Sequence, residues 1–241
     1  MRPEILFPLF APITSLPGVG PRIGQAMERM TGPHVIDLLW HLPNGLIDRS
    51  FAPKVADAPD GAVATITVTI GAHVAPRIKR LPYKVMCSDE TGELELVFFH
   101  ARPDYLEKVL PEGETRVISG KVEHYQGRIQ ITHPDHIAEV GELEDLQAIE
   151  ATYRLTAGLT PRPLGRAIKA ALKQAPALPE WNDAAWLKQE GWHGWLESLT
   201  VAHRPQSADD LEPDTAQRRR LAYDELLANQ LALALVRRHQ R

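Results

Sequence analysis

The chain has 241 residues, 44% hydrophobic and 24% charged, so it is long enough for one large globular domain or two modest ones. Its formal net charge of -4 excludes a protein that binds nucleic acid through overall positive charge, so any anion-binding surface must be local. Cys87 is the single cysteine, which excludes an internal disulfide and a zinc site of several thiolates and favours a cytoplasmic location. No signal peptide and no run of eighteen apolar residues is present, so we expect no membrane partner.

The first segment, residues 1–58, is predicted to be helical. The stretch SLPGVGPRIGQAM (15–27) leads into a helix, because apolar residues then recur at spacings of four and three. A second helix is predicted over 35–43, where a proline ends it.

Two glycines, Gly18 and Gly20, stand just before the first of these helices. In a helix-hairpin-helix motif such a loop offers backbone N–H groups to a DNA phosphate, and glycine lets the phosphate come close. Alternatively, the glycines simply form the turn and Pro21 takes the first helical position. Both readings stay open from the motif alone.

The second segment, residues 59–140, has a hydrophobic period of two, which indicates β-strands. Three strands, one helix over 102–110 and two more strands follow in that order. This is the order of an OB-fold, a five-stranded barrel with a helix between its third and fourth strands. Gly71 and Gly120, each within a strand, suit the bends that close such a barrel. The fold class is therefore predicted as α+β. The predicted strands are VATITVTIGAHV, LPYKVMCSDETG, ELELVFFH, TRVISGKVEHY and RIQITHP.

The loop between the first two predicted strands is the most basic part of the barrel. It carries Arg77, Lys79 and Arg80, at a place where OB-folds often contact a nucleic-acid backbone. The alternative is a solvated hairpin tip without a ligand.

Aromatic residues near the end of the third strand are candidates for stacking on bases. Phe98 and Phe99 are adjacent and should point to opposite faces, so one belongs to the core and the other to the surface. Alternation alone does not decide which of the two rings is exposed, and Tyr105 on the following helix could add a second exposed ring.

The third segment, residues 141–241, is predicted to begin with an acidic connector and continue as helices. Four tryptophans over 181–195 favour the core of a small helical subdomain. Leucines near helical spacing over 215–241 indicate a long packing helix.

No catalytic or metal-binding pattern emerges from the sequence. His133 and His136 lie beside a proline with no third spaced ligand, so we expect no zinc. The motif G-x-x-x-x-G-K-[ST] of ATP-binding loops is absent, as is G-x-S-x-G. A free-standing enzyme therefore has no support.

Taken in order, several stretches resemble the N-terminal wedge region of the RecG family of bacterial DNA helicases, over nearly the whole chain. They are ITSLPGVGPRIGQAM, VIDLLWHLPNGLIDRS, SDETGELELVFFH, VISGKVEHYQGRIQITHPDHI, YRLTAGLTPRPLGRAIKAAL and AQRRRLAYDELLANQLALAL.

This resemblance implies an OB-fold wedge that grips a three-way or four-way DNA junction at stalled replication forks, in repair and recombination. It assigns the base-stacking aromatic to Phe99, a contact to His100 where the family has asparagine, and a second ring to Tyr105. ATP and magnesium would belong to RecA-like motor domains, whose motifs this chain lacks, so the chain alone would need no cofactor. We expect a monomer.

A different class of function remains open. OB barrels also bind peptides, and the resemblance implies that the tail of single-stranded DNA-binding protein could share the surface. Steep weakening of binding by salt would favour DNA over a peptide.

Overall fold

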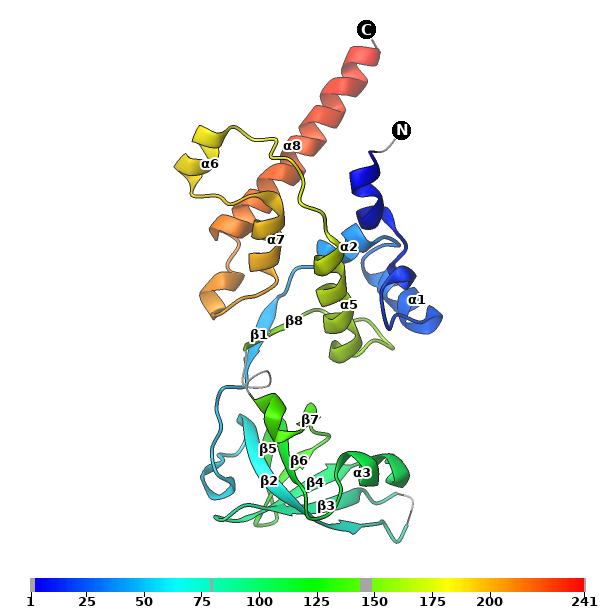
Figure 1. Cartoon of the computed structure of the whole chain (residues 1–241), viewed down its shortest axis with the longest axis vertical. Coiled ribbons are helices and arrows are strands. Elements are labelled where there is room, and N and C mark those ends of the chain that lie inside the picture. The colour runs from blue at the N-terminus through cyan, green and yellow to red at the C-terminus, as the bar shows by residue number, and fades with distance from the viewer. Residues whose placement is uncertain (1–2, 79, 144–148, 241) are drawn as a thin grey trace. The chain divides into compact units, whose positions relative to one another are not determined.

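The computed structural model describes residues 3–78, 80–143 and 149–240 and divides the chain into two compact units (Figure 1). One unit comprises residues 47–150, and the other combines 1–46 with 151–241. The predicted segments 1–58 and 141–241 thus contribute to one hydrophobic core, because apolar residues from both ends of the chain pack together there. The boundary runs through a two-stranded sheet of β1 (Gly45–Asp48) and β8 (Ile149–Thr152).

The barrel unit confirms the predicted α+β fold with a five-stranded OB-fold. Its sheet has the order β2-β3-β4-β6-β5, and pairing of β2 with β5 closes it. The short strand β7 adds to the free edge of β5. The bounds are β2 Val63–Val74, β3 Tyr83–Ser88, β4 Glu93–Phe98, β5 Thr115–Tyr125, β6 Arg128–Thr132 and β7 His136–Ala138, with α3 (Pro103–Val109), η3 (Val55–Asp57) and η4 (Val140–Glu142).

Strand alternation fills the barrel core. On β2 the residues Ala64, Ile66, Val68 and Ile70 are buried, as the period of two predicts. Cys87 is also buried there, and this burial raises the pKa of its thiol to about 12, so it packs as a small apolar side chain.

Both strand glycines lie at close approaches. The β2–β3 register shifts next to Gly71, and a Cβ there would lie 3.0 Å from the Met86 carbonyl oxygen. A Cβ on Gly120 would come within 2.7 Å of the Ile131 side chain. The predicted bends therefore have a steric basis.

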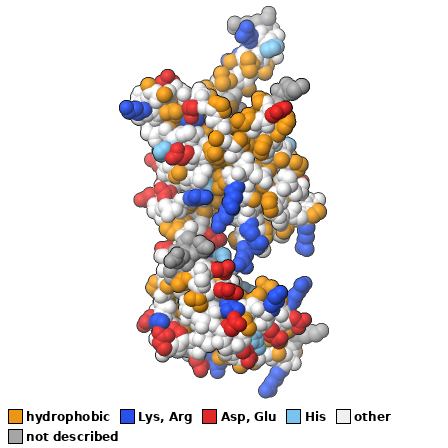
Figure 2. All heavy atoms as spheres, in the orientation of Figure 1, with side chains coloured by type: hydrophobic (Ala, Val, Ile, Leu, Met, Phe, Trp, Pro, Cys, Tyr) orange, Lys and Arg blue, Asp and Glu red, His pale blue; other side chains and the backbone are white. Residues whose placement is uncertain are grey.

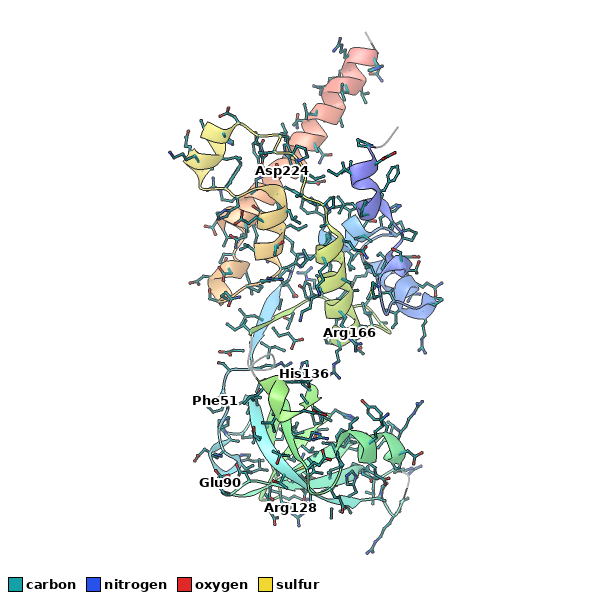
Figure 3. The ribbon with its side chains drawn as sticks, viewed as in Figure 1. Phe51, Glu90, Arg128, His136, Arg166 and Asp224 are labelled. Carbon is teal, nitrogen blue, oxygen red and sulfur yellow. The ribbon has the colours of Figure 1, made fainter. Side chains whose placement is uncertain are left out.

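Arg49 is a buried cation that ties the start of the barrel unit to its end. Its guanidinium donates to Asp135 at 3.0 Å, to Glu150 at 2.9 Å and to Ser119 at 3.1 Å. His136 also bonds Glu150. Its hydrogen bond and those of the Arg49 guanidinium lower the pKa of the Glu150 carboxyl to about 2, although partial burial raises it. Figure 3 labels His136 on β7. The buried charge is thus fully paired.

The helical unit consists of several short helices and the longer helices α5 and α8, which share one apolar core. They are η1 (Glu4–Phe10), η2 (Ile13–Ser15), α1 (Pro21–Met30), α2 (Val35–Leu39), α5 (Pro161–Gln174), α6 (Ala184–Glu190), α7 (Trp195–Ala202), η5 (Ala208–Leu211) and α8 (Ala216–His239). Among the described residues, no helix is long and apolar enough to cross a membrane.

Several elements differ from their predicted form. Helix α2 ends at Leu39 rather than at residue 43. A proline disfavours helical geometry at the residue before it, here Leu42, so the helix stops short of Pro43. The strands β1, β7 and β8 are too short to give a periodic signal and were not predicted. The tryptophan-rich stretch is only partly core: Trp192 and Trp195 are buried, but Trp181 and Trp186 are more than a third exposed.

Helix α8 packs only through its first half. Leu221 is buried, whereas Leu226, Leu231 and Leu235 are each more than half exposed, so the predicted leucine face does not pack along its whole length. The first half is held by Arg220, a fully buried cation that donates to Glu180 and Asp224.

Candidate nucleic-acid interface

The basic loop and the exposed aromatic lie at the same end of one strand pair. Strands β3 and β4 are antiparallel, and their register sets Tyr83 opposite Phe98. The loop 75–82 leads directly into Tyr83 and therefore ends beside Phe98 and its neighbour Phe99. Residues far apart in sequence, Arg80 and Phe99, are brought to one edge of the barrel in this way.

The two adjacent phenylalanines separate into core and surface as predicted. Phe98 ends β4 and packs into the barrel core, with 9% of its surface exposed. Phe99 is 45% exposed. It lies in a turn just past the strand, not in the strand itself.

His133 supports the Phe99 turn from the end of β6. The Phe99 backbone N–H donates to His133 Nε2 at 3.2 Å, and the two rings lie 5.9 Å apart at an angle of 38°. The His133 ring also packs edge-on against the Phe98 ring, with 6.1 Å between the ring centres. The His133 backbone N–H donates to the Val97 carbonyl at 2.9 Å. One histidine thus fixes both the backbone and the ring of Phe99.

His100 follows Phe99 in a left-handed backbone conformation, with φ of 56°. Asparagine, aspartate and histidine enter this region more readily than other side chains that carry a Cβ. The turn itself therefore accounts for histidine at the position where the resemblance places asparagine. The His100 side chain is exposed.

Arg77 and Arg80 are exposed, and no ion pair or side-chain hydrogen bond is recorded for them within the described part of the chain. Lys79, the third predicted cation, lies outside the described residues. Ile78 and Leu81 in the same loop are also more than half exposed. The loop therefore offers both unneutralised charge and apolar surface.

Several other cations on the barrel are already paired with carboxylates. Lys84 and Arg128, the latter labelled in Figure 3, both donate to the buried carboxylate of Glu95. Burial raises the pKa of Glu95, but these two hydrogen bonds outweigh it and leave the pKa below its ordinary value. The loop therefore contributes free positive charge, and so do the exposed Arg102, Lys108 and Lys121.

Tyr105 is 59% exposed in the first turn of α3, so its ring is free to contact a ligand. Sequence reasoning missed Arg102, an exposed residue at the N-terminal boundary of α3, three positions after Phe99. It also missed the role of His133. The spacing from Phe99 could have indicated Arg102, but the contact with His133 spans 34 positions and leaves no local signal.

Gly18 and Gly20 have a structural explanation. Gly18 has φ of 76°, which an L side chain rarely adopts, while Gly20 is the N-cap of α1 with Pro21 at the first helical position. Both glycines are exposed, and a Cβ would meet nothing within 4 Å of either. The predicted phosphate contact there stays a prediction.

The two histidines that were weighed as metal ligands are held by other partners. His133 accepts from the Phe99 backbone, and His136 bonds Glu150. Within residues 3–78, 80–143 and 149–240, no group of three or more histidine, cysteine or acidic side chains could hold a metal ion.

Comparisons with known proteins found similar chains and a similar fold. A family model described as an OB-fold nucleic acid binding domain matches residues 77–137. The RecG helicases of Acidithiobacillus ferridurans and Pasteurella multocida are each 28% identical to this chain, over 93% and 94% of its length. The chain spans only 32% and 33% of those relatives. A solved structure of RecG bound to a three-way DNA junction superposes with a TM-score of 0.74 and 24% identity, covering 96% of this chain and 32% of that one.

These matches follow the whole chain, from the N-terminal helices through the barrel to α8, rather than the barrel alone. They confirm the resemblance that the ordered sequence stretches predict. The chain is similar to the RecG helicases over nearly all of its own length and about a third of theirs, and it has an OB-fold barrel at its centre.

Proposed function

We propose that this chain binds branched DNA and that its barrel acts as the wedge at the branch point. The observation that carries the proposal is the β3–β4 register, which sets the unpaired cations of the loop 75–82 and the exposed ring of Phe99 at one end of the strand pair. Cations would hold phosphates on either side of a junction, while an aromatic ring stacks on the base that loses its partner there.

In a longer protein with motor domains, the wedge would separate strands as an ATP-driven motor pulled duplex past it. The similar solved structure is one of RecG bound to a three-way DNA junction, and this supports a junction as the ligand class. ATP and magnesium would act in those motor domains. This chain would supply the junction contacts and no catalytic group.

The direct test compares a fork with a linear duplex of equal length at one fixed salt concentration, using fluorescence anisotropy. The proposal predicts tighter binding to the fork. Equal affinity for both ligands would refute the wedge, because a surface that holds only duplex phosphates gains nothing from a branch.

A second candidate function is binding of an acidic peptide that carries apolar residues, such as the tail of single-stranded DNA-binding protein. It is favoured by the exposure of Ile78 and Leu81 between and beside the two loop arginines. Apolar contacts are less sensitive to salt than phosphate contacts. Substituting Ile78 and Leu81 by serine should abolish peptide binding and leave fork binding nearly unchanged if the two ligands use different parts of the loop.

A further inference from the structure

We propose that α5 in the helical unit is a second DNA-contact surface, which binds the phosphate backbone of double-stranded DNA. This surface is distinct from the barrel loop and does not depend on a branch point. It consists of Arg162, Arg166, Lys169 and Lys173, which we call the α5 stripe.

The spacing of these residues places them in one line along the helix. Successive gaps of four, three and four residues, at 3.6 residues per turn, keep all four side chains within about 60° of one another around the axis. The opposite side, with Leu164, Ile168 and Ala171, is buried in the core. The stripe therefore points outward, and it extends for roughly 16 Å at a rise of 1.5 Å per residue.

The four cations are exposed and unneutralised. None of them forms an ion pair within the described part of the helical unit. By contrast, Arg219 and Arg220 on α8 are both paired with carboxylates. Lysine and arginine side chains gather over the region of α5 in Figure 2, and Figure 3 labels Arg166 among them. Free cations in a row are what a row of phosphates requires.

The local sequence is depleted of acid in a chain that is acidic overall. Residues 151–179 contain five lysines and arginines and no aspartate or glutamate, although the net charge of the chain is -4. Carboxylates are therefore absent from the segment that bears the stripe, and its positive field is not cancelled by its own neighbours in sequence.

The composition of the exposed face favours nucleic acid over protein as the partner. No large apolar side chain of α5 is exposed, while stable protein interfaces have an apolar centre. In addition, Gly165 lies beside the stripe, with nothing within 4 Å of the position of a Cβ. Glycine is a poorer helix former than alanine, and here it leaves room for a backbone to approach closely.

The test measures binding of a fluorescent linear duplex across a series of salt concentrations. The variant Arg162→Ala/Arg166→Ala/Lys169→Ala/Lys173→Ala should lose about ten-fold or more in affinity at low salt and flatten the salt slope by roughly three to four units. The matched control is Lys188→Ala/Arg204→Ala/Arg237→Ala/Arg238→Ala, which removes the same charge from exposed positions of the same unit and should keep most of the affinity. The charge-conserving variant Arg162→Lys/Arg166→Lys should also keep it.

Unchanged duplex binding by the α5 variant, equal losses in both four-residue variants, or competition by poly-glutamate as strong as by duplex at equal charge would each overturn the proposal. Circular dichroism melting of each variant checks the fold. The branch-point function is read separately, from the ratio of fork to duplex affinity. If that ratio is one while the stripe variant still loses duplex, only the wedge fails; if the ratio persists and the stripe variant binds duplex normally, only the stripe fails.

Discussion

Phe99 and His133 form a fixed pair at the edge of the barrel, in which the histidine accepts from the Phe99 backbone at 3.2 Å and lies 5.9 Å from its ring. An exposed aromatic side chain would ordinarily sample several rotamers. Here one face of the ring is supported by His133, so less side-chain entropy remains to be lost when a base stacks on the other face.

The first prediction separates the two adjacent phenylalanines. Phe99→Ala should weaken fork binding roughly ten-fold or more, because stacking on a base is worth about 1–3 kcal/mol, and should leave the melting temperature nearly unchanged. Phe98→Ala should do the reverse and cost about 3–5 kcal/mol of stability, because Phe98 is in the core. Anisotropy and thermal melting measure the two effects.

Phe51→Ala is the matched control for Phe99→Ala. Phe51 is likewise 45% exposed in the barrel unit, and Figure 3 labels it. Its carbonyl accepts from Thr65, nine residues along β2 from Val74, the end that leads into the basic loop. Equal losses of fork binding in both variants would show that Phe99 has no special role.

The second prediction concerns the basic loop. Replacing Arg77, Lys79 and Arg80 by alanine should weaken binding to every DNA sequence alike and lower the salt slope by up to about three units. The control Lys54→Ala/Lys121→Ala removes two charges away from the loop. Lys121 lies opposite Val63, the first residue of β2, and Lys54 lies beside Glu90 in the turn between β3 and β4. A loop variant with the parent's salt slope would make the loop a solvated hairpin tip.

The third prediction concerns the buried cation of the barrel unit. Arg49→Ala should destabilise this unit by about 1–3 kcal/mol, since it leaves the partly buried Glu150, the exposed Asp135 and the buried Ser119 hydroxyl without their shared partner. Arg49→Lys should not rescue it, because an ammonium cannot reproduce the guanidinium fork. Lys54→Ala, which breaks the exposed pair with Glu90, is the control and should change stability little.

Amide hydrogen exchange of β5 and β7 is the measurement for Arg49, because all five tryptophans lie in the helical unit and do not report on the barrel. Faster exchange in both strands of Arg49→Ala is the expected result. Exchange at the parent's rate would mean that the Arg49 network contributes no stability.

The fourth prediction is a pH dependence of the helical unit. Burial of His203 lowers its pKa from 6.5 to about 4, although its Nε2 bonds the Leu39 carbonyl, and Tyr153 occupies its other nitrogen. The unfolded chain therefore binds more protons between pH 4 and 6.5. The stability from neutral His203 is fully present above pH 6.5 and is lost as the pH falls towards 4, by on the order of 3 kcal/mol.

Urea unfolding followed by tryptophan fluorescence at several pH values tests this. His203→Gln should be less stable than the parent at pH 7, because it disturbs both hydrogen bonds, and should show a shallower loss of stability down to pH 4. The exposed His193→Gln should keep the parent's pH profile. A His203→Gln profile parallel to the parent's would assign the acid sensitivity to other groups.

The barrel and the order of its five strands and one helix could be predicted from the sequence alone, because strand alternation, β-branched residues and turn residues are local signals. The sequence also separated Phe98 from Phe99, since adjacent residues near a strand end face opposite sides. The basic residues of the loop could be recognised from its composition. The short strands β1, β7 and β8 carry too few residues for a periodic signal.

Which distant residues come into contact depends on the folded structure. The pairing of Tyr83 with Phe98 joins the loop to the aromatic, and the contact of His133 with Phe99 joins the segments just past the ends of β6 and β4. The shared core of the chain's two ends likewise depends on packing between distant segments, not on any local pattern. Which cations are neutralised also depends on the fold, because Glu95 binds Lys84 and Arg128 on two neighbouring strands. The α5 stripe faces outward because the core covers the opposite face of that helix.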